Sequence, residues 1–174
     1  MRSRAAGGRL ALLVIGLGVT ACEALEPAER ATLDAWLGCT ECNEHELDSV
    51  LALGGRKREA TVTALRDGLL DGPSAGLREN FRHQLNSSYE DLADIRGQAT
   101  IVPRSEFVRR YMDNLLATYR TRSAVALARI GGADVKPALD SAAANQLRVP
   151  GDSLRPRDLD AVRFARDSLW QPNR

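Results

Sequence analysis

The chain has 174 residues and carries 24 Lys and Arg against 23 Asp and Glu, so its formal net charge is +1. This length accommodates one domain with a hydrophobic core of its own and is short for two domains of ordinary size. A net charge so close to zero offers no electrostatic case for binding the phosphates of a nucleic acid, and we expect no nucleic-acid partner.

The first 21 residues have the pattern of an export signal. Arg2, Arg4 and Arg9 form a basic start, and the uncharged apolar stretch 10–19 follows. This stretch is too short to span a bilayer, which takes about 20 apolar residues, so the pattern favours a cleaved signal peptide over a membrane helix. Removal of residues 1–21 leaves 21 basic and 23 acidic residues, a net charge of −2.

Residues 19–22, Val-Thr-Ala-Cys, follow the apolar stretch directly. An aliphatic residue, two small residues and a cysteine in this order resemble the lipobox of bacterial lipoproteins. The resemblance implies cleavage before Cys22, a diacylglyceryl group on its sulfur and usually an acylated amine. Apart from this covalent lipid, the sequence indicates no cofactor. An ordinary signal peptide followed by a cysteine by chance is the alternative.

The lipid implied at Cys22 would hold the protein at a membrane surface. One acyl chain binds a bilayer only marginally, whereas two or three chains give stable attachment. We therefore expect a cell-envelope protein anchored to the cell membrane or the outer membrane, on the periplasmic or extracytoplasmic face. Residues 22–26 would form a short linker between the lipid and a folded domain over residues 27–174.

From Pro27 onward the apolar residues recur at helical spacing, and the alternation typical of strands is missing. The predicted helices cover residues 27–37, 43–53, 59–70, 75–85, 105–130, 134–147 and 156–170, with one or two further turns over 89–95. Gly54-Gly55 are expected to end the second helix, residues 86–88 to interrupt the fourth and Asp134 to cap the sixth. The sequence therefore predicts an all-α fold.

Further residues support these helices. Ser74 is a predicted N-cap, because its hydroxyl can accept a hydrogen bond from a backbone amide of the first turn. Trp36, Phe81, Tyr111 and Tyr119 lie at helical spacing from leucine and valine residues. We expect all four aromatic side chains to pack in the core.

Two segments of the chain read alike. Residues 50–55, Val-Leu-Ala-Leu-Gly-Gly, and 128–132, Ala-Arg-Ile-Gly-Gly, each end a predicted helix, with Gly54 and Gly131 77 residues apart. That offset is near twice the ~40-residue period of HEAT and armadillo arrays. Residues 122–139, an Ala-rich helix, a Gly turn and an Asp-capped helix, are similar to bacterial HEAT-like repeats. The resemblance implies helical hairpins stacked as a short solenoid; an irregular helical bundle is the alternative.

The motif with the most reactive side chains is Cys39-Thr40-Glu41-Cys42, which is followed by His45. A structural disulfide between Cys39 and Cys42 is one interpretation, because an exported protein meets an oxidising compartment and Cys22 would carry lipid. A redox-active pair is the second, although such motifs usually follow a strand and none is predicted here. A metal site made of Cys39, Cys42 and His45 is the third, although no second pair of ligands completes tetrahedral zinc.

Five arginines form a locally basic stretch in the long predicted helix: Arg104, Arg109, Arg110, Arg120 and Arg122. They are either a patch for anionic lipid headgroups or an acidic partner, or an ordinary solvated helix face.

No common motif of a nucleophilic enzyme, a metalloprotease, a P-loop or a dinucleotide site is present, so we predict that the protein is not an enzyme. No small-molecule substrate is identified. We expect a membrane-anchored lipoprotein that acts as a non-catalytic helical-repeat scaffold and binds another protein. The alternative is an envelope thiol–disulfide or metal-handling protein that works through Cys39 and Cys42.

Overall fold

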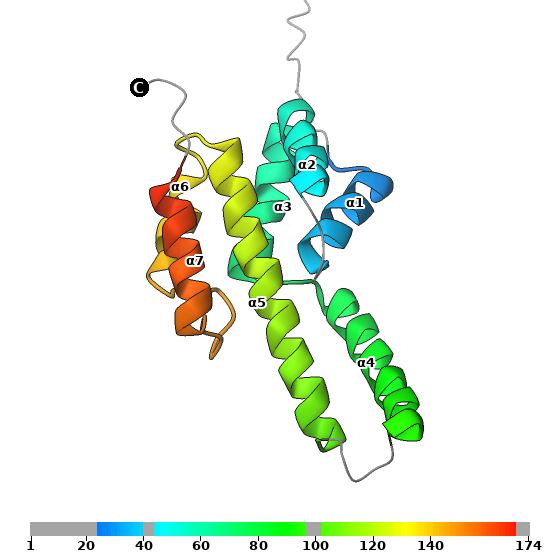
Figure 1. Cartoon of the computed structure of the whole chain (residues 1–174). Coiled ribbons are helices and arrows are strands. Elements are labelled where there is room, and N and C mark those ends of the chain that lie inside the picture. Colours follow the sequence, from blue (N-terminus) through cyan, green and yellow to red (C-terminus); the bar gives the residue numbers. More distant parts are fainter. Residues whose placement is uncertain (1–23, 40–43, 97–101, 170–174) are drawn as a thin grey trace, which may run out of the picture.

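The longest helix, α5 (Arg104–Ile130), runs through the middle of the molecule (Figure 1). The structure, a computed structural model, describes residues 24–39, 44–96 and 102–169, without the side chains of 44–45 and 93–96. Within these ranges it holds six further helices, α1 (Pro27–Gly38), α2 (Glu44–Arg56), α3 (Arg58–Leu70), α4 (Ala75–Arg96), α6 (Lys136–Ala143) and α7 (Pro156–Asp167). The described ranges hold no strand, and the predicted all-α fold is confirmed.

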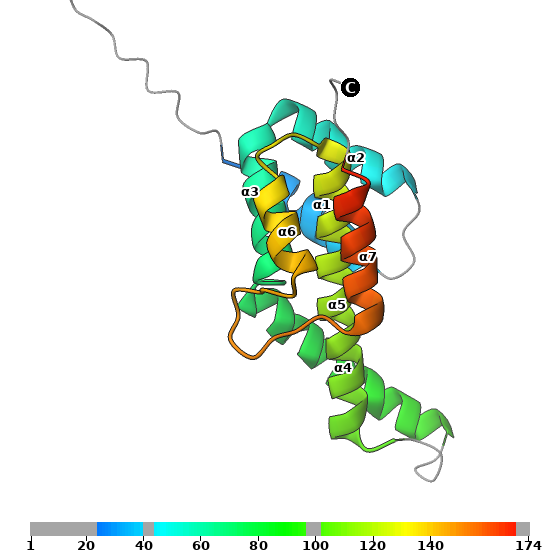
Figure 2. The ribbon, with the colours of Figure 1, turned by 90° about the vertical axis from the view of Figure 1, so that its left-hand side faces the viewer.

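Helix α5 packs against each of the other six helices. In a solenoid each unit contacts only its neighbours along the array, so one helix shared by the whole fold identifies a bundle. Figures 1 and 2 show α2, α3, α6 and α7 placed around the C-terminal half of α5, with α1 beside α2. Of the two arrangements that the sequence left open, the structure has the irregular helical bundle.

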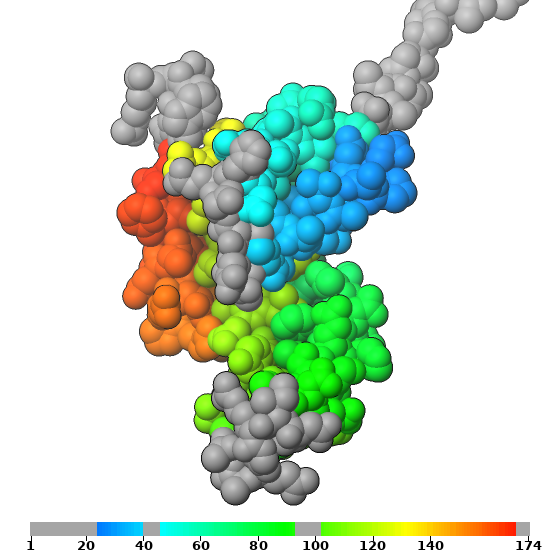
Figure 3. Space-filling view, turned by 45° about the vertical axis from the view of Figure 1, so that its right-hand side comes forward, coloured from blue at the N-terminus to red at the C-terminus, as the bar shows by residue number. Residues whose placement is uncertain are grey.

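The molecule has two regions that differ in how α5 is surrounded. We call α4 together with residues 104–114 of α5 the hairpin, and the rest of the described chain the body. Within the described residues, α4 packs against no helix except α5. The hairpin extends away from α1 and α2, and the space-filling view shows α4 lying along one side of α5 below α1 (Figure 3).

The body encloses the main hydrophobic core. Leu33, Leu37, Leu65, Leu127 and Leu139, from four different helices, are fully buried in it. Because each of these side chains removes apolar surface from water, the core accounts for most of the stabilisation of the fold.

A partly buried hydrogen bond joins α5 to α1 in the body. The hydroxyl of Tyr119 on α5 donates to Asp34 Oδ1 on α1 over 2.6 Å. Burial, together with the neighbouring Asp34 carboxylate, raises the pKa of Tyr119 well above its ordinary value. Tyr119 is therefore buried as predicted, and its polar end is satisfied.

The hairpin has a small core of its own. Leu85, Phe107 and Met112 are its buried residues. Phe107 packs edge-on against Tyr89, with ring centroids 5.4 Å apart, and lies 4.6 Å from the ring of Tyr111. The hydroxyl of Tyr89 donates to the carbonyl of Val102 over 3.1 Å, which ties α4 to the segment that enters α5.

The predicted end of the second helix at Gly54-Gly55 is wrong, because α2 continues through both glycines to Arg56. Gly54 lies against the end of α5, where a β-carbon would come within 2.9 Å of Ile130 Cδ1. A residue without a side chain therefore allows close helix packing here instead of ending the helix.

The predicted interruption at residues 86–88 is also wrong, since α4 is one continuous helix. Asn86 Nδ2 donates to the carbonyl of Arg82 over 2.9 Å, so this side chain bonds to its own helix without breaking it. The predicted cap at Ser74 is confirmed by a 3.2 Å hydrogen bond from the backbone amide of Leu77 to Ser74 Oγ.

Asp134 does not cap α6, whose N-cap is Val135 and lacks a side-chain cap hydrogen bond. Its carboxylate accepts a 2.7 Å hydrogen bond from Arg58 at the start of α3. The same guanidinium donates to the carbonyl of Gly131 over 2.5 Å. Arg58 thus joins α3 to the turn between α5 and α6, and this tertiary contact replaces the local cap.

Candidate functional site

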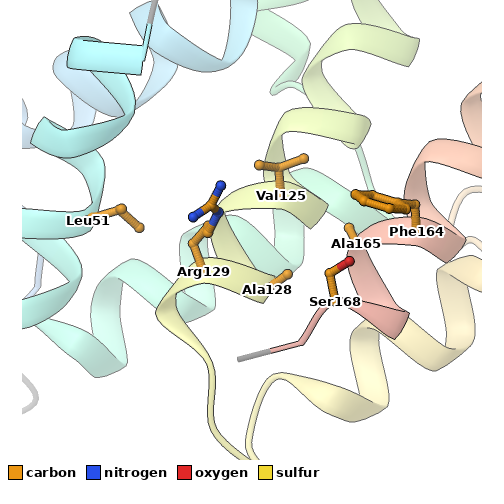
Figure 4. Close-up of a pocket in the computed structure, with 7 residues that line it drawn as sticks. All are labelled: Leu51, Val125, Ala128, Arg129, Phe164, Ala165 and Ser168. Atoms are coloured by element: carbon orange, nitrogen blue, oxygen red, sulfur yellow. The ribbon is translucent and has the colours of Figure 1, made fainter. Parts of the chain in front are cut away.

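An open groove lies on the body between α2, α5 and α7 (Figure 4). Its volume is about 510 Å³, and most of its lining is apolar. The residues that line it are Leu51 from α2, Val125, Ala128 and Arg129 from α5, Phe164 and Ala165 from α7, and Ser168, the C-cap of α7. Figure 4 shows Leu51 and Phe164 on opposite sides, with Val125 and Arg129 between them.

The groove exposes apolar side chains that are large enough to contribute to binding. Phe164 is 74% exposed and Val125 is 37% exposed. Among the described residues, Tyr111 of the hairpin is the one other large apolar side chain of this exposure, at 48%. The prediction that Tyr111 is a core residue is therefore wrong, because near the start of α5 the neighbouring helix in the described chain is α4 (Figure 1).

The groove exists because the ring of helices around α5 is incomplete. Helices α2 and α7 both pack against α5, but within the described chain they do not pack against each other. Val125 and Arg129 are one helical turn apart on α5, so both lie on the face of α5 that is between α2 and α7. Within the described residues, this face of α5 has no neighbouring helix.

Arg129 gives the groove a positive charge. Among the described residues its guanidinium makes no hydrogen bond and no ion pair. The acids on α7 have partners of their own: Asp158 pairs with Arg155, Asp160 with Arg163 and Asp167 with Arg166. Among the described residues, the groove therefore combines apolar side chains with one cation that has no ion pair.

The five arginines of the basic stretch do not form an open patch, because each is engaged within the molecule. On the hairpin Arg104 pairs with Glu90 at 2.7 Å, Arg109 with Asp113 at 3.2 Å and Arg110 with Glu106. These contacts favour the interpretation of a solvated helix face in this part of α5.

The other two arginines of the stretch are structural. Arg122 donates to the carbonyl of Trp36 and lies 5.4 Å from the centre of its indole ring, and partial burial lowers the pKa of its guanidinium. Arg120 is 3% exposed and donates to Asp152 Oδ2 over 2.5 Å, although its Nε has no partner among the described residues. This buried ion pair fixes the loop before α7 against α5, beside a cavity of about 260 Å³.

The predicted cysteine site is only partly described. Cys39 is the C-cap of α1 and is disulfide-bonded. Cys22 and Cys42 lie outside the described residues, as does the side chain of His45, so the pairing of Cys39 with Cys42 and the metal alternative stay predictions. The end of α1 presents backbone carbonyls, which disfavour a thiolate there and so favour a structural role for Cys39.

The described residues hold neither a helix that could span a membrane nor a cluster of metal ligands. None of the helices in this part of the chain is long and apolar enough to cross a bilayer. The same part of the chain shows no group of three or more His, Cys, Asp and Glu side chains that could hold a metal ion. The lipid attachment predicted at Cys22 lies outside these residues.

Sequence reasoning missed the groove, although one of its residues carried a signal. Phe164 comes two positions after the buried Val162, and residues in a helix turn by about 100° per position. The aromatic ring therefore lies almost opposite the buried face of α7, among charged and polar residues. A large apolar residue on the polar face of an amphipathic helix is the pattern that indicates a contact surface.

No family model, no curated protein and no solved structure matches the chain.

Proposed function

We propose that this protein is a membrane-anchored lipoprotein of the cell envelope that works without catalysis, as a helical module that binds another protein. The lipobox-like residues 19–22 support the anchor, and the groove between α2, α5 and α7 supports the binding role. The observation that carries the proposal is that Phe164 and Val125, both exposed, lie together in this one groove.

An exposed aromatic side chain beside other apolar residues is the usual centre of a protein–protein contact. Burial of a Phe or Val side chain stabilises a complex by about 1.5–3 kcal/mol, and a few such residues carry most of the binding energy. The apolar residues of the groove come from three helices, and the core of the body holds these helices in place. Little conformational entropy is therefore lost on binding.

The anchor is tested by Cys22→Ala. We expect the unchanged chain to sediment with membranes and to carry the mass of at least two acyl chains. The variant should lose both this mass and membrane attachment. If Cys22→Ala has the mass and membrane attachment of the unchanged chain, the proposed anchor is wrong.

The binding role is tested by photo-crosslinking in the native membrane. Phe164→p-benzoylphenylalanine places a photoreactive group at the edge of the groove, and Tyr111→p-benzoylphenylalanine is a matched control, because it alters an exposed aromatic residue on the hairpin. We expect a discrete crosslink to a second protein from position 164 and none of the same size from position 111. Equal crosslinking from both positions, or none from 164, contradicts the proposal.

A further inference from the structure

We infer that the groove between α2, α5 and α7 binds an amphipathic helix of a partner protein, and that this helix carries a carboxylate that pairs with Arg129. This inference rests on the proposed function, and it adds the shape and the chemistry of the occupant.

The packing of α5 indicates a helix. At its C-terminal half α5 contacts α2 on one side and α7 on the other, and these two do not pack against each other within the described residues. A helix placed between them would contact α5 through Val125 and the two flanking helices through Leu51 and Phe164. Grooves of this kind bind the apolar face of a helix, with anchors one or two turns apart.

The charge of the groove indicates an acid on that helix. Arg129 lies among Val125, Ala128 and Leu51 and makes no ion pair among the described residues. Asp48, exposed on α2, does not line the groove. A partner that covered Arg129 with apolar atoms alone would bury an unpaired cation, which is strongly unfavourable. A carboxylate can instead accept two hydrogen bonds from the guanidinium.

The test uses the full chain in phospholipid nanodiscs and a displayed library of random 16-residue peptides as the probe. We expect selected peptides to carry apolar residues at helical spacing and at least one Asp or Glu. A proline in the middle of such a peptide should abolish binding, because it interrupts the helix. Phe164→Ala should weaken binding about tenfold or more, as the loss of one buried apolar contact predicts.

A double-mutant cycle then isolates the ion pair. Replacement of the peptide's carboxylate by the corresponding amide should weaken binding to the unchanged protein about fivefold, the range expected for a partly exposed pair. The same replacement should have no further effect on Arg129→Gln, because the partner is already missing. Arg66→Gln, an exposed arginine on α3 away from the groove, is the matched control and should leave affinity unchanged.

Four results would overturn the inference. If the selected peptides depend on Phe164 but show no coupling to Arg129, or lack acids, the proposed carboxylate is wrong and the proposed function stands. If the peptides bind equally well with a central proline, the occupant of the groove is not a helix. A chain that forms dimers in sedimentation equilibrium, and loses them with Phe164→Ala, has a second copy as the occupant. A library that yields no binder sensitive to Phe164→Ala removes the groove as a binding site, and with it the proposed function.

Discussion

The body and the hairpin share one helix, α5, and differ in what surrounds it. In the body five helices pack on α5 and, within the described chain, leave one face open, whereas the hairpin is α4 packed along the other end of α5 (Figure 1). The body therefore has fully buried leucines from four helices, while among the described side chains of the hairpin three are buried, Leu85, Phe107 and Met112. An exposed aromatic residue therefore has a different structural cause in each region.

In the hairpin, Tyr111 is exposed because too few helices are present to cover α5, and its ring still packs on Phe107. In the body, Phe164 is exposed although the helix that carries it is well packed through Val162 and Ala165. The first residue completes a small core, and the second is available to a partner. The predictions below test this difference, from the largest expected effect on stability to the smallest.

The largest effect is expected from Leu127→Ala in the body. Leu127 is fully buried on α5, so the variant loses apolar burial and leaves a cavity, and the free energy of unfolding should fall by about 2–5 kcal/mol. Chemical denaturation followed by circular dichroism measures this value. A loss below about 1 kcal/mol would mean that the body is not packed around α5.

Tyr119→Phe should lower the free energy of unfolding by about 1.5–3 kcal/mol, since Asp34 loses a short hydrogen bond to its carboxylate. The pKa of Tyr119 is raised in the folded state, so the unfolded chain ionises first as the pH rises. The stabilisation is complete below pH 10 and is lost as the pH rises above that value.

Denaturation of both proteins between pH 7 and pH 11 checks the sign of this effect. The unchanged chain should lose stability above about pH 10, and Tyr119→Phe should lack this part of the decrease. An identical pH dependence of the two proteins would show that Tyr119 does not link ionisation to folding.

If Cys42 is the partner of the disulfide-bonded Cys39, as the sequence predicts, the double variant Cys39→Ser/Cys42→Ser should lower the free energy of unfolding by about 2 kcal/mol or less, because a bridge across so short a loop removes little entropy from the unfolded chain. Crosslinking from position 164 should persist in this variant. If the variant folds but cells that carry it have the same phenotype as cells without the protein, the thiol–disulfide or metal-handling alternative is favoured instead.

The smallest effect on overall stability is expected from Phe107→Ala in the hairpin. Because α5 is the one helix that α4 packs on among the described residues, and Leu77 is the α4 residue that reaches the main core, the hairpin should open without the body, and the unfolding free energy of the body should change by less than about 1 kcal/mol. Hydrogen exchange resolves the two regions. Amides of α4 should exchange much faster in the variant, and those of α3 should be unchanged; equal acceleration in both would show that the regions unfold together.

Most helices could be predicted from the sequence because apolar periodicity and local capping are properties of neighbouring residues. Ser74 and the buried face of α1 are examples. Local reasoning failed where a distant residue decided the outcome. Gly54 lies inside α2, where the missing side chain leaves room for Ile130. Asp134 does not cap α6, because its carboxylate binds Arg58. The groove could not be predicted, since it arises from the relative positions of three helices far apart in the chain.

The central claim is that the groove of the body is occupied in the membrane and that the hairpin surface is not. Hydroxyl-radical footprinting measures the accessibility of Phe164 and Tyr111 in the same sample, once in native membranes and once with the purified chain. We predict that Phe164 is labelled several times less in native membranes than in the purified chain, while Tyr111 is labelled equally in both. Equal labelling of Phe164 in the two samples, or protection of Tyr111 as strong as that of Phe164, would contradict the account.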